Sequence, residues 1–175
     1  MIIFGRFDLN SDSTTTKNTG TKNTASGSRV AAIAHEAERS DEIELEADFT
    51  SKHFGRIDQA IAMGALFTAH HLGCKAIIAL TESGSTALWM SRYKIHVPIY
   101  ALTSQLLSQR KMALLRNVHP IAMPRFDDRD AALARAESLL VEAGVLKPAD
   151  TYVITNGEPM GYPGGTNMMK VGQVA

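Results

Sequence analysis

The chain has 175 residues, of which 45% are hydrophobic and 21% are charged, and this composition is typical of a globular protein with one core. Lys and Arg together number 18, and so do Asp and Glu, so no excess of positive charge can attract nucleic acid or an anionic membrane. No apolar stretch is long enough to span a membrane, and the first residues do not resemble a secretion signal. The single cysteine, Cys74, cannot form an internal disulfide. These features predict a cytoplasmic protein in which any anion site is local.

The first 55 residues are predicted to precede the main domain. Residues 10–28 consist almost entirely of Ser, Thr, Asn, Gly and Lys, and we predict a disordered leader over residues 1–28. Residues 29–55 are predicted to form a helix, over 29–39, and an acidic connector. One face of that helix carries the apolar residues Val30, Ile33, Ala34 and Ala37, so it requires a surface to pack against.

From residue 56 onward, predicted helices and short apolar runs alternate along the chain. A helix over 56–72 ends at a glycine, and helices are also predicted over 86–93, 105–116 and 128–143, with apolar runs at 75–80, 97–102, 119–123 and 151–155. Continuous apolar runs are typical of parallel strands that are covered on both faces.

A last strand is predicted at 166–174, and the loop before it is too short for a crossover helix, so that strand should run antiparallel to its predecessor. Residues 56–175 are therefore predicted to form an α/β domain of three layers, with a five-stranded mixed sheet, helices on both faces and an antiparallel last strand.

The loop after the first predicted strand has the composition of a phosphate-binding loop. It comprises Thr81, Glu82, Ser83, Gly84, Ser85 and Thr86, at the junction where a buried strand passes into a helix. Backbone amides from Ser83 to Thr86 are expected to be unpaired there, and the hydroxyl groups add further donors. The loop lacks the Gly-Lys-Ser/Thr ending that holds a nucleoside triphosphate. The alternative is that Ser83 or Ser85 simply caps the helix.

A second loop, rich in glycine and proline, follows the fourth predicted strand and could fold over a ligand on the first loop. We predict contacts to such a ligand from Gly157, Glu158, Pro159, Gly161, Gly164 and Gly165. The alternative is a plain hairpin connection whose glycines serve the turn geometry.

No metal site and no catalytic residues are predicted. His70 and His71 are neighbours on a helix and point about 100° apart, so they cannot both face one metal ion. The other histidines are scattered along the chain. No pair of carboxylates is placed to bridge phosphates through a metal ion, as phosphoryl transfer requires.

The order of motifs resembles the C-terminal domain of bacterial pyruvate kinases over about residues 29–174. The resemblance is carried by IDQAIAMGALFTAHHLGCKAIIALTESGSTALWMSRY and by DTYVITNGEPMGYPGGTNMMKV. It implies the same five-stranded fold and a regulatory domain that binds allosteric sugar phosphates or nucleotides and forms an interface of a homo-oligomer. It also implies a place in glycolysis, where the parent enzyme transfers a phosphoryl group from phosphoenolpyruvate to ADP in a separate barrel domain.

The chain departs from the family at two points. Many members carry Arg or Lys where this chain has Ser85, and those that bind a bisphosphorylated sugar carry Trp and Arg in the closing loop, whereas residues 158–165 here include no basic residue. We therefore expect a monophosphate effector, a sugar monophosphate or AMP, held mainly by amides and hydroxyls.

The second departure is that the catalytic barrel has no counterpart in the sequence. The magnesium and potassium sites belong to that barrel, so no cofactor is expected in this chain, which is predicted to be inactive alone. The alternatives are an oligomerisation module without a ligand and the non-catalytic part of a split pyruvate kinase whose barrel is a separate partner.

Overall fold

The computed structural model describes residues 29, 32–33 and 53–175 of the chain. The predicted leader at 1–28 and most of the segment 29–55, including three of the four residues of the apolar stripe, lie outside these residues. Arg29, Ala32 and Ile33 are helical, as expected for that segment. The elements that follow all belong to the compact unit Ile43–Ala175.

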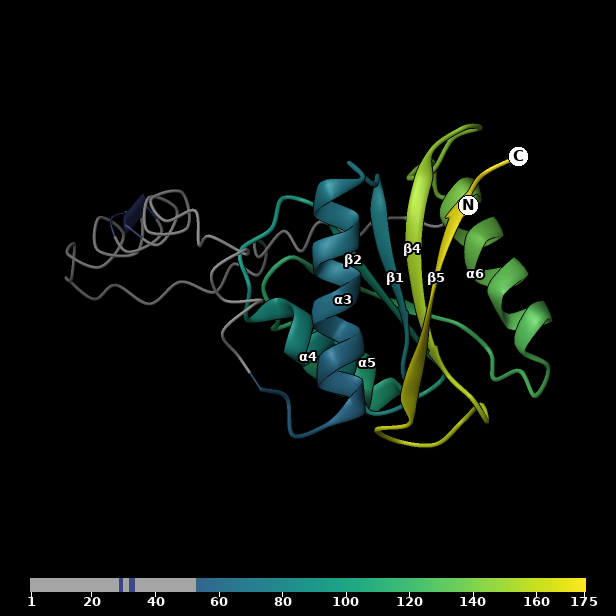
Figure 1. Ribbon diagram of the computed structural model, residues 1–175, viewed down its shortest axis with the longest axis horizontal. Helices are drawn as coiled ribbons and strands as arrows, with labels where there is room; N and C mark the ends of the chain where they lie inside the picture. Colours follow the sequence, from purple (N-terminus) through teal and green to yellow (C-terminus); the bar gives the residue numbers. More distant parts are fainter. Residues whose placement is uncertain (1–28, 30–31, 34–52) are drawn as a thin grey trace, which may run out of the picture. The chain divides into compact units, whose positions relative to one another are not determined.

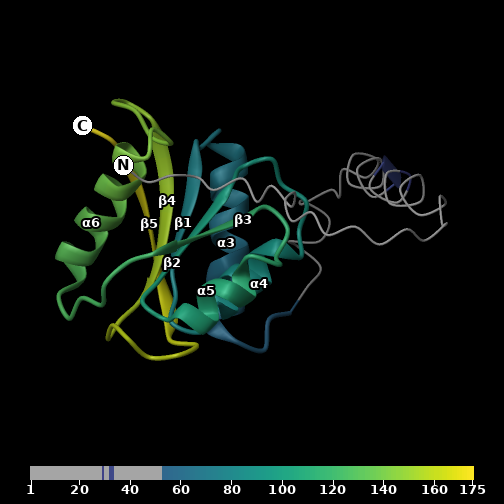
Figure 2. The same cartoon turned by 180° about the vertical axis from the view of Figure 1, so that it is seen from behind.

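The unit is a single five-stranded sheet with helices on both faces, as predicted (Figures 1 and 2). In chain order its elements are α3 (Ile57–His71), β1 (Ala76–Leu80), α4 (Ser85–Ser91), β2 (Ile99–Thr103), α5 (Leu106–Met112), β3 (Val118–Ala122), α6 (Arg129–Glu142), β4 (Thr151–Gly157) and β5 (Thr166–Gln173). The strands lie in the order β3-β2-β1-β4-β5. β1 to β4 are parallel, and β5 runs antiparallel to β4, which confirms the expectation from the short loop between them.

Two apolar cores hold the layers together. On one face α3, α4 and α5 pack on the sheet, with Leu66, Ile77 and Met90 among the fully buried residues. On the other face α6 packs through Ala136 and Leu140. Because all five residues of β1 are buried, its two faces contribute alternately to both cores. This burial on both faces explains why the sequence of β1 is apolar without interruption.

The edges of the sheet differ from its centre. β3 forms one edge and is only partly buried, although its sequence suggested a strand covered on both faces. It contains Pro120, which has no amide hydrogen to donate and is tolerated at an edge. β5 forms the other edge, and most of its side chains are exposed.

The topology creates a switch point beside β1. The chain runs from β1 through β2 to β3 with its helices on one face, and it returns through α6 on the opposite face to β4, which lies on the other side of β1. In open α/β sheets, ligands bind outside the carboxyl ends of the strands at such a point. The loops after β1 and β4 both begin at this place.

Candidate functional site

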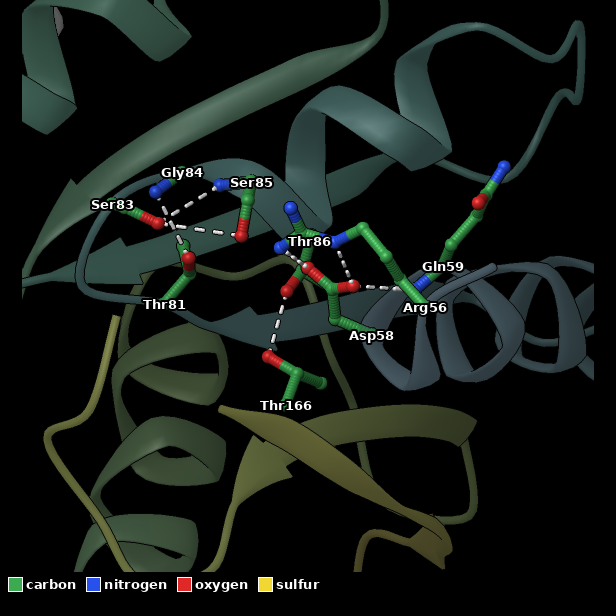
Figure 3. A network of polar contacts seen from close by, with 9 residues as sticks. All are labelled: Arg56, Asp58, Gln59, Thr81, Ser83, Gly84, Ser85, Thr86 and Thr166. Atoms are coloured by element: carbon green, nitrogen blue, oxygen red, sulfur yellow. Dashed lines mark hydrogen bonds and ion pairs between the residues drawn. The ribbon is translucent and has the colours of Figure 1, made fainter. Parts of the chain in front are cut away.

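The loop from Thr81 to Thr86 lies between β1 and α4, where the sequence predicted it. Gly84 adopts a positive φ of 82° as the N-cap of α4 and its amide donates to Thr81 Oγ1 at 3.0 Å, while the Ser85 amide donates to Ser83 Oγ at 3.4 Å (Figure 3). Two of the four amides expected to be unpaired therefore bond within the loop. The amides of Ser83 and Thr86 have no acceptor among the described residues. The Thr86 hydroxyl is also engaged, because it pairs with Thr166 Oγ1 at 2.7 Å.

A buried carboxylate lies directly beside this loop. Asp58, in the first turn of α3, is 2% exposed and receives hydrogen bonds from Arg56 Nε at 2.9 Å and from Arg56 Nη2 at 2.8 Å. The Gln59 amide donates to it at 3.0 Å. Burial by itself raises the pKa of Asp58, but the Arg56 hydrogen bonds and charge, with smaller contributions from the Gln59 amide and the Ser85 hydroxyl, outweigh it, so the pKa lies below its ordinary value. The carboxylate is thus ionised and lies near Ser85 of the loop.

The second predicted loop is closed at its base by a side-chain clamp. The Glu158 amide donates to Asn167 Oδ1 at 2.9 Å, and Asn167 Nδ2 donates to the Glu158 carbonyl at 2.6 Å. Gly161 and Gly164 adopt positive φ angles of 84° and 71°, so glycine is required there for the turn. Both are also close to arginines: a methyl group on Gly161 would lie 2.8 Å from Arg125 Cζ, and one on Gly164 would lie 3.2 Å from Arg56 Nη2.

A cleft lies between the two loops at the carboxyl ends of the parallel strands. The space between its walls, counted together with the open solvent at its mouth, is about 540 Å³. Its walls come from the first loop, from the residues that follow β2 and β3, and from the closing loop: Leu80, Thr81, Glu82, Leu102, Thr103, Ser104, Met123, Pro124, Arg125, Phe126, Gly157, Met160, Gly161, Tyr162 and Thr166. The fold therefore brings Thr81, Glu82, Gly157 and Gly161 of the predicted site to one cleft. Ser83 and Ser85 lie instead beside a shallower, largely apolar depression next to Leu88, Lys111 and Met112.

Three arginines near the loops were missed by the sequence analysis. Arg56 precedes α3, and Arg125 lies between β3 and α6. Arg129 is the first residue of α6 and pairs with Asp130 at 2.9 Å and with Glu158 at 3.8 Å. The expectation of a monophosphate rested on the absence of basic residues within 158–165. The structure supplies positive charge from elsewhere in the chain, and no short-range pattern in the sequence signals this.

The remaining candidates form no site in the part of the chain that the structure covers. There, no group of three or more His, Cys, Asp or Glu residues could hold a metal ion. Likewise, none of the helices described here has the length and apolar character needed to cross a bilayer. Cys74 is buried, and burial raises the pKa of its thiol.

The fold and the cleft together define an open, doubly wound α/β domain with a cleft at its switch point. Residues 59–172 match the family model of the pyruvate kinase alpha/beta domain, and the chain belongs to that family.

Curated relatives agree with this assignment. The chain is 38% identical to a pyruvate kinase of Buchnera aphidicola over 136 residues, which are 77% of the chain and 28% of that protein. It is 37% identical to a pyruvate kinase of Staphylococcus epidermidis over 143 residues, which are 82% of the chain and 24% of that protein. The chain thus spans about a quarter of the length of these relatives.

Among solved structures, the crystal structure of a pyruvate kinase from Cryptosporidium parvum matches with a TM-score of 0.66 at 23% identity. The match covers 79% of the chain and 28% of that structure. At this identity the match supports the fold alone, and it agrees with the five-stranded mixed sheet described above.

Proposed function

We propose that this chain is a regulatory domain that binds a phosphorylated effector, a sugar monophosphate or AMP, between the loop after β1 and the loop after β4. The pyruvate kinase reaction of its relatives is the activity that such a domain would control, in the cytoplasm. The observation that carries the proposal is the cleft at the switch point, because both predicted loops line it and parallel α/β sheets collect ligands there.

The chemistry of the cleft walls and of the loop beside them supports a phosphorylated sugar or nucleotide. The amides of Ser83 and Thr86 have no acceptor among the described residues, and they lie at the start of α4. Ser104 and the Glu82 carboxylate stand at the mouth of the cleft, where hydroxyl groups of a sugar would find both a donor and an acceptor. Arg125 adds a positive charge to the same cleft.

The proposal is tested by ligand titration of the full chain. Ribose 5-phosphate, glucose 6-phosphate and AMP are titrated by calorimetry and by thermal unfolding, and the fluorescence of Trp89 on α4, the single tryptophan, gives an independent signal. A ligand at ten times its Kd should stabilise the protein by about 1.4 kcal/mol and raise Tm by roughly 4 °C. No response to any of these compounds at millimolar concentration would contradict the proposal.

Substitution of the exposed Ser83 separates binding at the loop from binding elsewhere. Ser83→Asp places a carboxylate where the phosphate is proposed to lie, so the response to all three ligands should be lost. Ala134→Asp on α6 adds the same charge at an exposed position that does not line the cleft and should bind like the wild type. An equal loss of the ligand response in both variants would indicate a general effect of the added charge.

A second function is favoured by a separate observation at the edge of the sheet. β5 pairs with β4 along one side only, and Met168, Met169 and Val171 are 36%, 37% and 42% exposed. Backbone groups along an open edge can pair with another strand, and apolar side chains beside them favour a protein partner. We propose that β5 forms the contact of a homo-oligomer.

A further inference from the structure

We propose that Arg56 is the cation of the phosphate site and that the buried carboxylate of Asp58 holds it between the two loops. This inference rests on the proposed function, because it names the residue that supplies positive charge to that same site. Asp58 acts through Arg56 and is a positioning residue.

The phosphate loop by itself lacks a positive charge. Its donors are backbone amides and hydroxyls, and Glu82 within it carries a negative charge that opposes an anion. A dianionic phosphate is bound more strongly by a charged donor, and hydrogen bonds from a guanidinium group are roughly twice as strong as neutral ones. A site of this kind therefore gains most from an arginine that is already oriented.

Arg56 is the arginine that lies near both loops. Its Nε and Nη2 donate to the two oxygens of Asp58 (Figure 3), and Asp58 is close enough to Ser85 of the phosphate loop for that hydroxyl to lower the pKa of the carboxylate. On its other side Nη2 lies next to Gly164 of the closing loop, with 3.2 Å to the position that a methyl group would take there. The side chain is 56% exposed, so a ligand can reach it.

The pair with Asp58 leaves donors for a ligand. A guanidinium group has five N–H bonds, and two of them are used by Asp58. The other three have no acceptor among the described residues. Because Asp58 is buried and also held by the Gln59 amide, the guanidinium orientation is fixed before a ligand arrives, and less side-chain entropy is lost on binding.

The other nearby arginines are placed for different contacts. Arg129 is paired with Asp130 and Glu158. Arg125 packs against Gly161 and lines the cleft, and no hydrogen bond links it to the phosphate loop within the described residues. Arg125 is therefore suited to the end of a ligand that is remote from the phosphate.

The test measures binding of inorganic phosphate and ribose 5-phosphate to the full chain, by calorimetry and Trp89 fluorescence, at low and high salt. Arg56→Gln should weaken binding of both probes about tenfold and reduce the dependence of the affinity on salt, because one charge-assisted contact is lost. Arg56→Lys keeps the positive charge but cannot form bidentate hydrogen bonds, so it should recover only part of the affinity that Arg56→Gln loses. Arg135→Gln on α6 removes the same charge at a residue that does not line the cleft and that pairs with Glu142, and it should bind like the wild type.

Asp58→Asn tests the positioning role. It should weaken binding about threefold in the wild-type background and have no effect in the Arg56→Gln background, since coupled residues are not additive. Urea unfolding of each variant verifies that it is folded, and Arg56→Lys decides the question if Arg56→Gln does not fold. If the wild type binds the probes, unchanged affinity in Arg56→Gln or tighter binding in Asp58→Asn would overturn the inference. No binding to the wild type would instead overturn the proposed function.

Discussion

Asp58 shows how one residue links stability to the candidate site. Its side chain is almost fully buried, and a buried carboxylate is tolerated only when hydrogen bonds and an opposite charge compensate for the lost water. Arg56 and the Gln59 amide provide that compensation, and Arg56 also lies next to Gly164 of the closing loop. A change at Asp58 should therefore affect both folding and binding.

The pH dependence of stability should report on this residue. The folded-state pKa of Asp58 is lower than its ordinary value of 3.8. The contribution of the ionised Asp58 to the free energy of unfolding is therefore fully present above pH 3.8, and it is lost as the pH falls through the lower folded-state pKa. The free energy of unfolding, measured with urea, should thus differ between wild type and Asp58→Asn at pH 6, and the difference should shrink at pH 3. Asp127→Asn, at a fully exposed carboxylate, serves as the matched control for the loss of one negative charge. A difference that stays constant with pH would contradict the ionised pair.

At the scale of elements, α4 depends on the backbone conformation of the residue that precedes it. Gly84 has a φ of 82° and packs against the side chain of Met112 of α5. The start of α4 is therefore fixed both by the left-handed backbone conformation of Gly84 and by this contact. The loop after β1 thereby keeps its shape without a side-chain cap on the helix. The alternative in which Ser83 or Ser85 caps α4 is not what the structure shows, since Gly84 is the N-cap; Ser83 instead binds the Ser85 amide.

Two glycine substitutions should have opposite effects. Gly84→Ala forces an L-residue into a left-handed conformation and places a methyl group 2.9 Å from Met112 Cγ, so the free energy of unfolding should fall by about 1–2 kcal/mol. Gly64→Ala, inside α3 with nothing within 4 Å, should raise it by about 0.5–1 kcal/mol. Urea unfolding followed by circular dichroism measures both. Equal effects of the two changes would show that the conformation of Gly84 is not required.

At the scale of the whole molecule, the two ends of the sheet have different surroundings. β3 ends the sheet with a proline, which limits further pairing, whereas β5 ends it with exposed apolar side chains. An edge of this second kind is a natural place for association with another copy of the chain. The candidate ligand cleft lies at the carboxyl ends of the strands, and the β4–β5 connection belongs to both regions.

The proposed interface predicts the behaviour of one surface variant. Val171→Lys puts a charge on the exposed face of β5 and should convert the oligomer to a monomer, as measured by size-exclusion chromatography with light scattering. Val141→Lys makes the same change on α6, where the valine is comparably exposed, and should leave the oligomer intact. An oligomer that survives Val171→Lys would place the interface elsewhere.

The sequence by itself determined the order and type of the elements and the position of both loops. The apolar runs of β1, β2 and β4 required burial on two faces, and the short link between β4 and β5 required an antiparallel pair, because these are local consequences of chain geometry and hydrophobicity. Only the tertiary structure decided which charges surround the loops. Arg56 and Arg125 come from segments far from Gly164 and Gly161 in the sequence, and the parallel sheet brings them together at one end. No periodic pattern encodes such long-range proximity, and for this reason the electrostatics of the cleft could not be predicted from the residues of the loops alone.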